Sequence, residues 1–168
     1  MAPYNTRVVR LSNALQEHAY GRRFRYREAM AYGGDLAAPL RAAAVSAGVA
    51  VGIAGLAFGP TRALLDRVLP APGEGPDEQT RLEGGFVTET RTRASGGASY
   101  RCVIEASGDP GYQATAVMIG ESALALLLDR DRLPERAGVL TPASGIGAVL
   151  ADRLRAAGFR IDVARLDP

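Results

Sequence analysis

The sequence predicts an α+β fold: a small, mostly antiparallel sheet with flanking helices and a long apolar helical hairpin. Three observations support this prediction. A charge-free run of small apolar residues covers 42–61, two segments rich in β-forming residues flank a Gly-Gly turn at 96–97, and two later segments have apolar residues at helical spacing. A chain of 168 residues is long enough to form one domain with its own core.

The N-terminal segment predicts a helix that is capped by Asn5 or Thr6 and ends before Gly21. In residues 22–30, arginines then alternate with aromatic and other side chains, which is the period of a half-exposed strand. Arginines interleaved with aromatics also occur in nucleic-acid-binding surfaces. Since no second basic cluster joins them and the net charge is only +2, we expect a solvated strand face and no nucleic-acid partner.

Residues 36–69 predict the apolar helical hairpin. Asp35 is the expected N-cap, the first helix runs to Gly59, and Pro60 begins a second, short helix. The charge-free part, Ala42 to Thr61, has twenty residues. As a helix it would be ~30 Å long, which is about the thickness of the hydrocarbon core of a bilayer.

Four glycines lie at spacings of four, three and four in this run, so one helix would carry them in a single stripe. They are Gly48, Gly52, Gly55 and Gly59. Each costs a water-exposed helix ~1 kcal/mol relative to alanine, which favours a stripe against which another backbone or a lipid surface lies closely. Two interpretations remain open: a membrane-associated helix and a helix that is deeply buried in the protein.

The second half of the chain predicts the sheet and the remaining helices. A Pro/Gly-rich connector covers 70–83, and strands are expected at 86–93 and 99–106. Asp109 and Pro110 begin a helix that ends in the charged residues 129–132. Thr141 and Pro142 begin another, expected to run to Ala157 and stop at Gly158, and a short strand follows at 159–164.

One segment imitates a dinucleotide-binding fingerprint. Ser144-Gly145-Ile146-Gly147 is followed by a helix and then by a strand that ends near an acid. The third glycine of the G-x-G-x-x-G pattern is absent, and Pro142 stands where a phosphate-binding turn would need a free N–H. We therefore interpret this segment as an ordinary helix and predict that the chain holds no complete Rossmann domain.

Composition excludes several kinds of chemistry. All 20 basic residues are arginine, so Schiff-base chemistry and a catalytic lysine are ruled out. Cys102 is the one cysteine and His18 the one histidine, which leaves no disulfide, no histidine- or thiolate-based metal site and no Ser-His-Asp triad within the chain. The N-terminal residues do not have the pattern of a secretory signal, which predicts a cytoplasmic setting.

Five motifs occur in the order found in one known family. They are the residues at 5–10 (NTRVVR), 72–76 (PGEGP), 108–112 (GDPGY), 121–124 (ESAL) and 138–143 (GVLTPA). The chain resembles the C-terminal half of the saccharopine dehydrogenase-like oxidoreductases, in particular the bacterial trans-acting enoyl reductases. The resemblance implies an NAD(P)H-dependent reduction of an enoyl double bond on an acyl or polyketide-type substrate, in lipid or glycolipid biosynthesis near a membrane.

The resemblance also implies what this chain lacks. Members of the family begin with a nucleotide-binding domain that carries a glycine-rich fingerprint, and no such fingerprint stands in this sequence. We therefore expect residues 1–168 to be a single C-terminal domain for substrate binding and oligomerisation, with 141–164 as a returning edge of the missing domain. NAD(P)H is not expected to bind this chain alone. The expected partners are the acyl substrate, a membrane surface at the inner face of the plasma membrane, and a second copy in a homodimer.

Candidate site residues are few. Asp109 and Tyr112, at the start of a helix, are the candidates for orienting or polarising a substrate carbonyl, although a capping aspartate and a packed tyrosine would look the same. Arg7 and Arg10 are the candidates for binding a phosphate of cofactor or carrier, and they are equally ordinary as surface charges. No metal site is expected.

Two functions remain. In the first, the chain is part of an enoyl reductase and is inactive without its nucleotide-binding domain. In the second, it is a stand-alone, non-catalytic module that interacts with lipid or membrane.

Overall fold

The computed structural model describes residues 2–65 and 73–166, which separate into two compact units. The first unit combines residues 3–26 with the chain from Pro76 onward, and the second comprises residues 27–75. The first unit contains the sheet, whereas the second contains the apolar helix.

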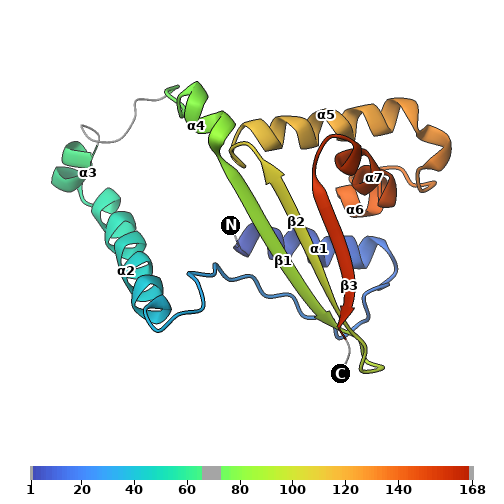
Figure 1. Ribbon diagram of the computed structural model, residues 1–168, viewed down its shortest axis with the longest axis horizontal. Helices are drawn as coiled ribbons and strands as arrows, with labels where there is room; N and C mark the ends of the chain where they lie inside the picture. Colours follow the sequence, from blue (N-terminus) through green and yellow to red (C-terminus); the bar gives the residue numbers. More distant parts are fainter. Residues whose placement is uncertain (1, 66–72, 167–168) are drawn as a thin grey trace. The chain divides into compact units, whose positions relative to one another are not determined.

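The sheet of the first unit has the strand order β1-β2-β3 and is antiparallel throughout (Figure 1). β1 (Gly85–Arg93) pairs with β2 (Ser99–Ser107) from Gly85↔Ser107 to Arg93↔Ser99. β3 (Arg160–Leu166) pairs along the other side of β2. The predicted α+β class, the two strands and their Gly-Gly turn are confirmed, and the segment 141–164 supplies part of this sheet through β3.

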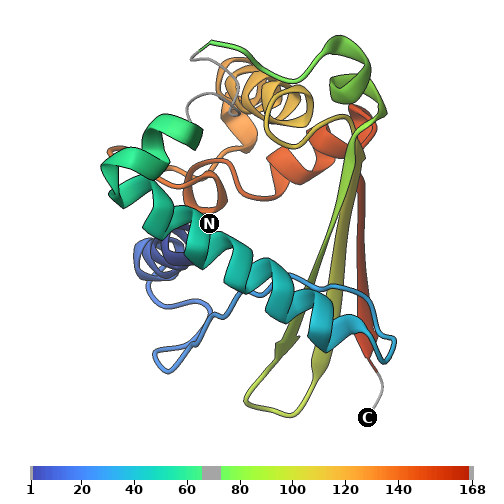
Figure 2. The same cartoon turned by 90° about the vertical axis from the view of Figure 1, so that its left-hand side faces the viewer.

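The two faces of the sheet differ in polarity. Figure 2 shows α5 (Gln113–Leu128) and α7 (Ala148–Ala156) on one side of the strands. The strand side chains that pack into the core on this side are Phe86, Ile104, Ala106 and Ile161. Phe86 meets Phe159 edge to face, with 6.3 Å between the ring centroids. On the other face Glu89 forms ion pairs with Arg91 and Arg101, and Val103, which is opposite Glu89 in the register, is buried among these charged side chains.

The helix predicted for 142–157 is in fact two helices, so that prediction was wrong. α6 (Pro142–Gly145) and α7 are separated at Ile146 and Gly147, where Gly147 has φ 64° and ψ −135°. The N–H groups of both residues donate to the carbonyl of Pro142, which closes the first helix. A positive φ of this kind favours glycine, and at Gly147 it changes the direction of the chain before α7 begins.

The start of α5 also differs from the prediction. The helix begins at Gln113 with Tyr112 as its N-cap, although Asp109 was expected to cap it. Asp109 caps the preceding turn instead: its Oδ2 accepts the N–H of Tyr112 at 2.9 Å, and its carbonyl accepts the N–H of Ala114. The range predicted as a connector, 70–83, contains α4 (Glu78–Glu83), which is capped by Asp77. Residues 66–72, shared between the predicted hairpin and connector, lie outside the described residues.

Residues 22–30 form no strand, so this prediction was wrong. α1 (Ala2–Leu15) ends well before them, and the boundary between the two units falls at Tyr26 and Arg27. A strand needs a hydrogen-bonded neighbour, and the described sheet consists of β1, β2 and β3 alone. Alternation of arginines with other residues is therefore compatible with an irregular, exposed segment.

In the second unit, α2 (Ala38–Ala57) is followed by α3 (Gly59–Leu65). Among the described helices, α2 is the one long and apolar enough to cross a membrane by length and composition. None of its residues is buried. Asp35 is not its cap, because Ala37 holds the N-cap position and the Asp35 carboxylate pairs with Arg41.

The glycine stripe is shorter than predicted. Phe58 is extended, with φ −107° and ψ 121°, and Gly59 belongs to α3, where Pro60 follows it in the first turn. α2 therefore carries three of the four glycines, Gly48, Gly52 and Gly55. A Cβ built on Gly48 or Gly52 would meet no atom within 4 Å, so nothing in the described part of the second unit packs closely on them.

Candidate ligand-binding site

A hollow of about 720 Å³ opens in the first unit between the end of α5, the segment 130–140 and α6. Its volume lies in the range of small-molecule sites, ~300–1,000 Å³. The apolar part of its lining consists of Leu126, Leu133, Pro134, Leu140, Pro142 and Ile146. The polar part includes Ser122, Arg130, Glu135, Arg136 and Thr141. We refer to this hollow as the α5–α6 pocket.

The apolar wall of the α5–α6 pocket continues into the core. Ile146 is buried in a cluster with Ala125 of α5 and Val149 of α7, and Leu133 packs against this cluster. The lining is therefore supported from behind by well-packed side chains. Such a wall can hold an apolar chain in a defined place and keep water from it.

Three buried hydroxyl groups fix the start of α6 at the edge of the pocket. Ser12 Oγ lies 2.7 Å from Thr141 Oγ1, which lies 3.0 Å from Ser144 Oγ. Ser12 Oγ also donates to the carbonyl of Val8 at 2.8 Å. Because each hydroxyl has one proton, Thr141 must donate to Ser12 when Ser12 donates to Val8. The proton of Ser144 then points to Thr141, whose carbonyl accepts it at 3.1 Å beside Oγ1. This chain of hydrogen bonds joins α1 to the α5–α6 pocket.

Thr141 also confirms the predicted helix start. Its N–H donates to Ser144 Oγ at 3.0 Å, and Pro142 is the first residue of α6. A second contact joins α1 to the pocket, because the guanidinium of Arg136 donates to the carbonyl of Leu15. The segment 130–140 is therefore held at both ends, by α5 on one side and by α1 on the other.

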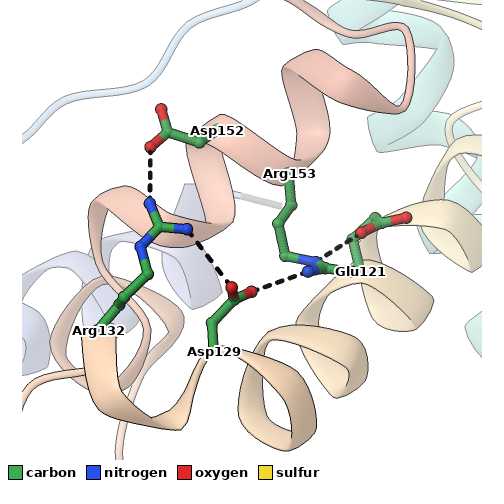
Figure 3. Close-up of polar contacts among 5 residues, drawn as sticks. All are labelled: Glu121, Asp129, Arg132, Asp152 and Arg153. Atoms are coloured by element: carbon green, nitrogen blue, oxygen red, sulfur yellow. Dashed lines mark hydrogen bonds and ion pairs between the residues drawn. The ribbon is translucent and has the colours of Figure 1, made fainter.

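An ion-pair network, drawn in Figure 3, holds α5 and α7 together. Arg153 Nε lies 2.8 Å from Glu121 Oε2, and Arg153 Nη1 lies 2.8 Å from Asp129 Oδ2. Arg132 pairs with Asp129 at 3.4 Å and with Asp152 at 3.5 Å. The hydrogen bond to Asp129, and after it the one to Glu121, raise the pKa of the Arg153 guanidinium. The network positions α5 against α7, and the Glu121 carboxylate is already paired with Arg153.

The residues predicted to act on a substrate do not lie in this pocket. Asp109 and Tyr112 precede the first turn of α5, whereas Leu126 lines the pocket from its last turn. At ~1.5 Å per residue these two positions are about 20 Å apart. Tyr112 is 55% exposed, and the Asp109 carboxylate accepts its N–H. Arg7 and Arg10 are exposed on α1 and do not line the pocket.

The segment that imitates a dinucleotide fingerprint does not fit a cofactor pyrophosphate. A phosphate-binding turn must offer free backbone N–H groups to the ligand. Here the N–H groups of Ser144 and Gly145 donate to the carbonyl of Thr141, at 3.0 and 2.9 Å. Those of Ile146 and Gly147 donate to Pro142, and Ser144 is 1% exposed. No step of a reaction is therefore assigned to a nicotinamide at this segment.

Metal chemistry has no evident site in the described ranges. No three His, Cys, Asp or Glu side chains gather there as metal ligands would. The α5–α6 pocket has apolar side chains along its wall and arginines among its polar residues, and this combination suits an amphipathic molecule.

Sequence reasoning missed Arg130 and Arg136 as candidate ligand residues. The available signal was weak: charged residues follow the end of a long apolar helix, and a proline at position 134 indicates a loop. Spacing along a loop does not reveal which side chains face a common hollow. Only the path of the chain after α5 brings these arginines beside Leu126 and Ile146.

Comparison with known proteins finds that nearly the whole chain is similar to proteins named trans-acting enoyl reductase. It is 49% identical over 168 residues to the trans-acting enoyl reductase of Mycobacterium bovis strain BCG. It is 48% identical over 170 residues to a putative trans-acting enoyl reductase of Mycobacterium tuberculosis, and 47% identical to the trans-acting enoyl reductase of Mycobacterium ulcerans. These matches cover 98–99% of this chain and 40% of each relative.

The resemblance stated from the sequence motifs is confirmed. Along almost its whole length the chain is similar to the trans-acting enoyl reductases, and it spans 40% of their length. No family model matches the chain, and no solved structure matches it.

Proposed function

We propose that this chain is the acyl-binding part of an enoyl reductase of the saccharopine dehydrogenase-like type, acting in polyketide or lipid biosynthesis. The observation that carries the proposal is identity of 47–49% to proteins named trans-acting enoyl reductase along almost the whole chain. The α5–α6 pocket supports it, because an acyl chain needs an apolar wall of this kind and size.

In this proposal the chain binds and orients the acyl group and does not hold NAD(P)H by itself. The absence of an NAD(P)H site in this chain is supported by the backbone N–H groups of residues 144–147. All four donate to the carbonyls of Thr141 or Pro142, so none is free for a phosphate. The chain would then be inactive without a nucleotide-binding domain supplied in another segment or polypeptide. Asp109 and Tyr112 lie away from the pocket, so their role in polarising a carbonyl is a separate proposal, as is the role of Arg7 and Arg10 in contacting a phosphate.

Calorimetric titration of the full chain with trans-2-octenoate and trans-2-dodecenoate tests the acyl-binding role. If the chain lies along the apolar wall, each added methylene contributes ~0.8 kcal/mol, so the longer acid should bind far more tightly. Leu126→Trp, which fills the pocket from α5, should abolish this gain. Equal affinities for the two acids would contradict the proposal.

A parallel titration with NADPH tests the missing cofactor site. We expect no saturable heat up to millimolar cofactor, with the oxidised and the dephosphorylated forms as comparison ligands. Saturable binding at micromolar NADPH would show that these residues alone hold the cofactor, which the arrangement at 144–147 does not support.

A second candidate function is a non-catalytic module that interacts with lipid, at the inner face of the plasma membrane. The observation that favours it is α2, twenty residues long, apolar enough to span a bilayer and without a buried residue. Flotation with liposomes should carry the chain upward, and the double variant Val51→Asp/Ile53→Asp should stay at the bottom. Exclusion of the unaltered chain from liposomes of every composition would contradict it.

The homodimer is a further proposal, supported by the outer side of α5. Ile119 and Leu127 on this side are 66% and 74% exposed, although α5 lies in the well-packed first unit. Exposed apolar side chains in one stripe favour contact with another surface. Light scattering after size-exclusion chromatography of the chain and of Leu127→Glu would show whether a dimer forms there.

A further inference from the structure

Two arginines of the α5–α6 pocket carry charges that no ion pair of the described residues neutralises. Arg132 and Arg153, which are close to them in the fold, are both paired with carboxylates. Arg130 lines the pocket without an ion pair, and so does Arg136, which gives one N–H to the carbonyl of Leu15. Each guanidinium has five N–H donors, so most of the donor capacity of both groups is unused.

Arg130 and Arg136 are exposed, and the apolar wall of the pocket lies beside both of them. Leu126, Leu133 and Leu140 supply an apolar wall beside them, so a ligand can place a chain on the wall and a head group near the guanidiniums. Arginine forks bind phosphate and carboxylate bidentately, through charge-assisted hydrogen bonds. Glu135 also lines the pocket, and its carboxylate disfavours a ligand with more negative charge than the two arginines can hold.

We propose that Arg130 and Arg136 bind the anionic head of a ligand whose linear apolar chain lies along the wall of the α5–α6 pocket. The inference rests on the proposed function, because it assigns the head-group chemistry of the acyl ligand. Two sources share this chemistry: a free acyl carboxylate, and a phosphate-bearing arm that carries the acyl group. In both cases the arginines bind the charged end of the ligand, and this determines how the ligand is oriented along the wall.

The test holds the chain length constant and changes the head group. Dodecanoate, dodecyl phosphate and dodecanol are titrated into the full 168-residue chain, the two anions below their critical micelle concentrations and the alcohol below its solubility limit. We expect both anions to bind at least tenfold more tightly than the alcohol. A tighter phosphate identifies the carrier-arm source, and a tighter or equal carboxylate identifies the free acid.

Charge removal at the pocket gives the second arm. Arg130→Gln should weaken both anions about tenfold and leave dodecanol unchanged, and Arg136→Gln added to it should remove the remaining preference. Because Arg136 also contacts Leu15, the single variant at Arg130 keeps the test valid if the double variant folds poorly. The matched control is Arg93→Gln/Arg165→Gln, which removes two arginine charges at a separate hollow beside the β1–β2 turn.

The possible outcomes separate this inference from the proposed function. Equal affinity for the anions and the alcohol, with unchanged binding in Arg130→Gln, would overturn the head-group assignment while the acyl site stands. A loss of anion binding in the Arg93/Arg165 control as large as in the pocket variants would also overturn it, since net charge alone would then explain the effect. If none of the fatty acids of either chain length binds, the proposed acyl-binding role itself is contradicted.

Discussion

The hydroxyl groups of Ser12 and Thr141 lie 2.7 Å apart, although 129 positions separate the two residues in the sequence. Both side chains are buried, and Thr141 is at once the N-cap of α6 and part of the lining of the α5–α6 pocket. This contact makes the N-terminal helix a support for the pocket. A ligand site in this chain therefore depends on α1, which does not itself line it.

Ser12→Ala should destabilise the first unit. The change leaves the buried Thr141 hydroxyl without its acceptor and should cost ~1–3 kcal/mol in the free energy of unfolding. Urea denaturation followed by circular dichroism measures it. Ser122→Ala is the control, because Ser122 Oγ donates to Met118 within the same helix and its loss should be close to neutral. A Ser12 variant as stable as this control would show that the contact is unimportant.

Arg153→Met should lower the melting temperature more than Arg155→Met does. Arg153 is the cation shared by Glu121 and Asp129, and its removal leaves the half-buried Glu121 without a cation and Asp129 with Arg132 alone. Arg155 pairs with Asp152 at the exposed surface, where an ion pair contributes little. Adding Glu121→Gln and Asp129→Asn to Arg153→Met should recover part of the loss. No recovery would contradict the electrostatic explanation.

Substitutions of two glycines should have opposite signs. Gly147→Ala should cost ~1–3 kcal/mol, because φ 64° with ψ −135° is a conformation that side chains rarely adopt. A Cβ there would meet Ala143 and Pro134 at ordinary distances, so the cost is conformational. Gly120→Ala, in the middle of α5 with no atom within 4 Å, should stabilise by up to ~1 kcal/mol. Thermal unfolding of both variants is the measurement.

The charged face of the sheet should lose stability in acid. Hydrogen bonds from Arg101, and then from Arg91, lower the pKa of Glu89 below its ordinary value of 4.5. A carboxylate with a lowered folded-state pKa stabilises the protein above its unfolded pKa, and this contribution is lost as the pH falls through the folded value. Melting temperatures measured between pH 7 and pH 3 should therefore fall less steeply for Glu89→Gln.

The same variant should be less stable than the parent at pH 7, and the difference should shrink in high salt, because the pair is partly exposed and salt screens it. Parallel pH profiles for Glu89→Gln and the parent would mean that Glu89 does not contribute to the acid response.

Local signals predicted much of the fold. The Gly-Gly turn and its flanking threonines and valines gave strands at 86–93 and 99–106, within one residue of β1 and β2. Thr141 and Pro142 predicted the start of α6, and the charge-free run predicted α2. Each of these features depends on neighbours only a few residues away, which is the range over which propensity and capping act.

Other predictions were wrong because they depended on distant partners. Residues 22–30 have a strand-like alternation but no neighbouring strand, so they remain irregular. The run 142–157 reads as one helix, yet the chain must turn at Gly147 so that Val149 and Leu154 can enter the core. Periodicity cannot register such a turn, since it reports only the average preference of a segment.

The amino-acid sequence by itself determined the α+β class, the β1–β2 hairpin, the apolar character of α2 and the kinship with trans-acting enoyl reductases. Tertiary structure alone decided that Ser12 meets Thr141, that β3 lies beside β2, and that Arg130 and Arg136 share a hollow with Leu126. The physical reason is that turns, caps and apolar runs are set by adjacent residues, whereas a site is assembled from side chains that only the packing of helices on the sheet brings together.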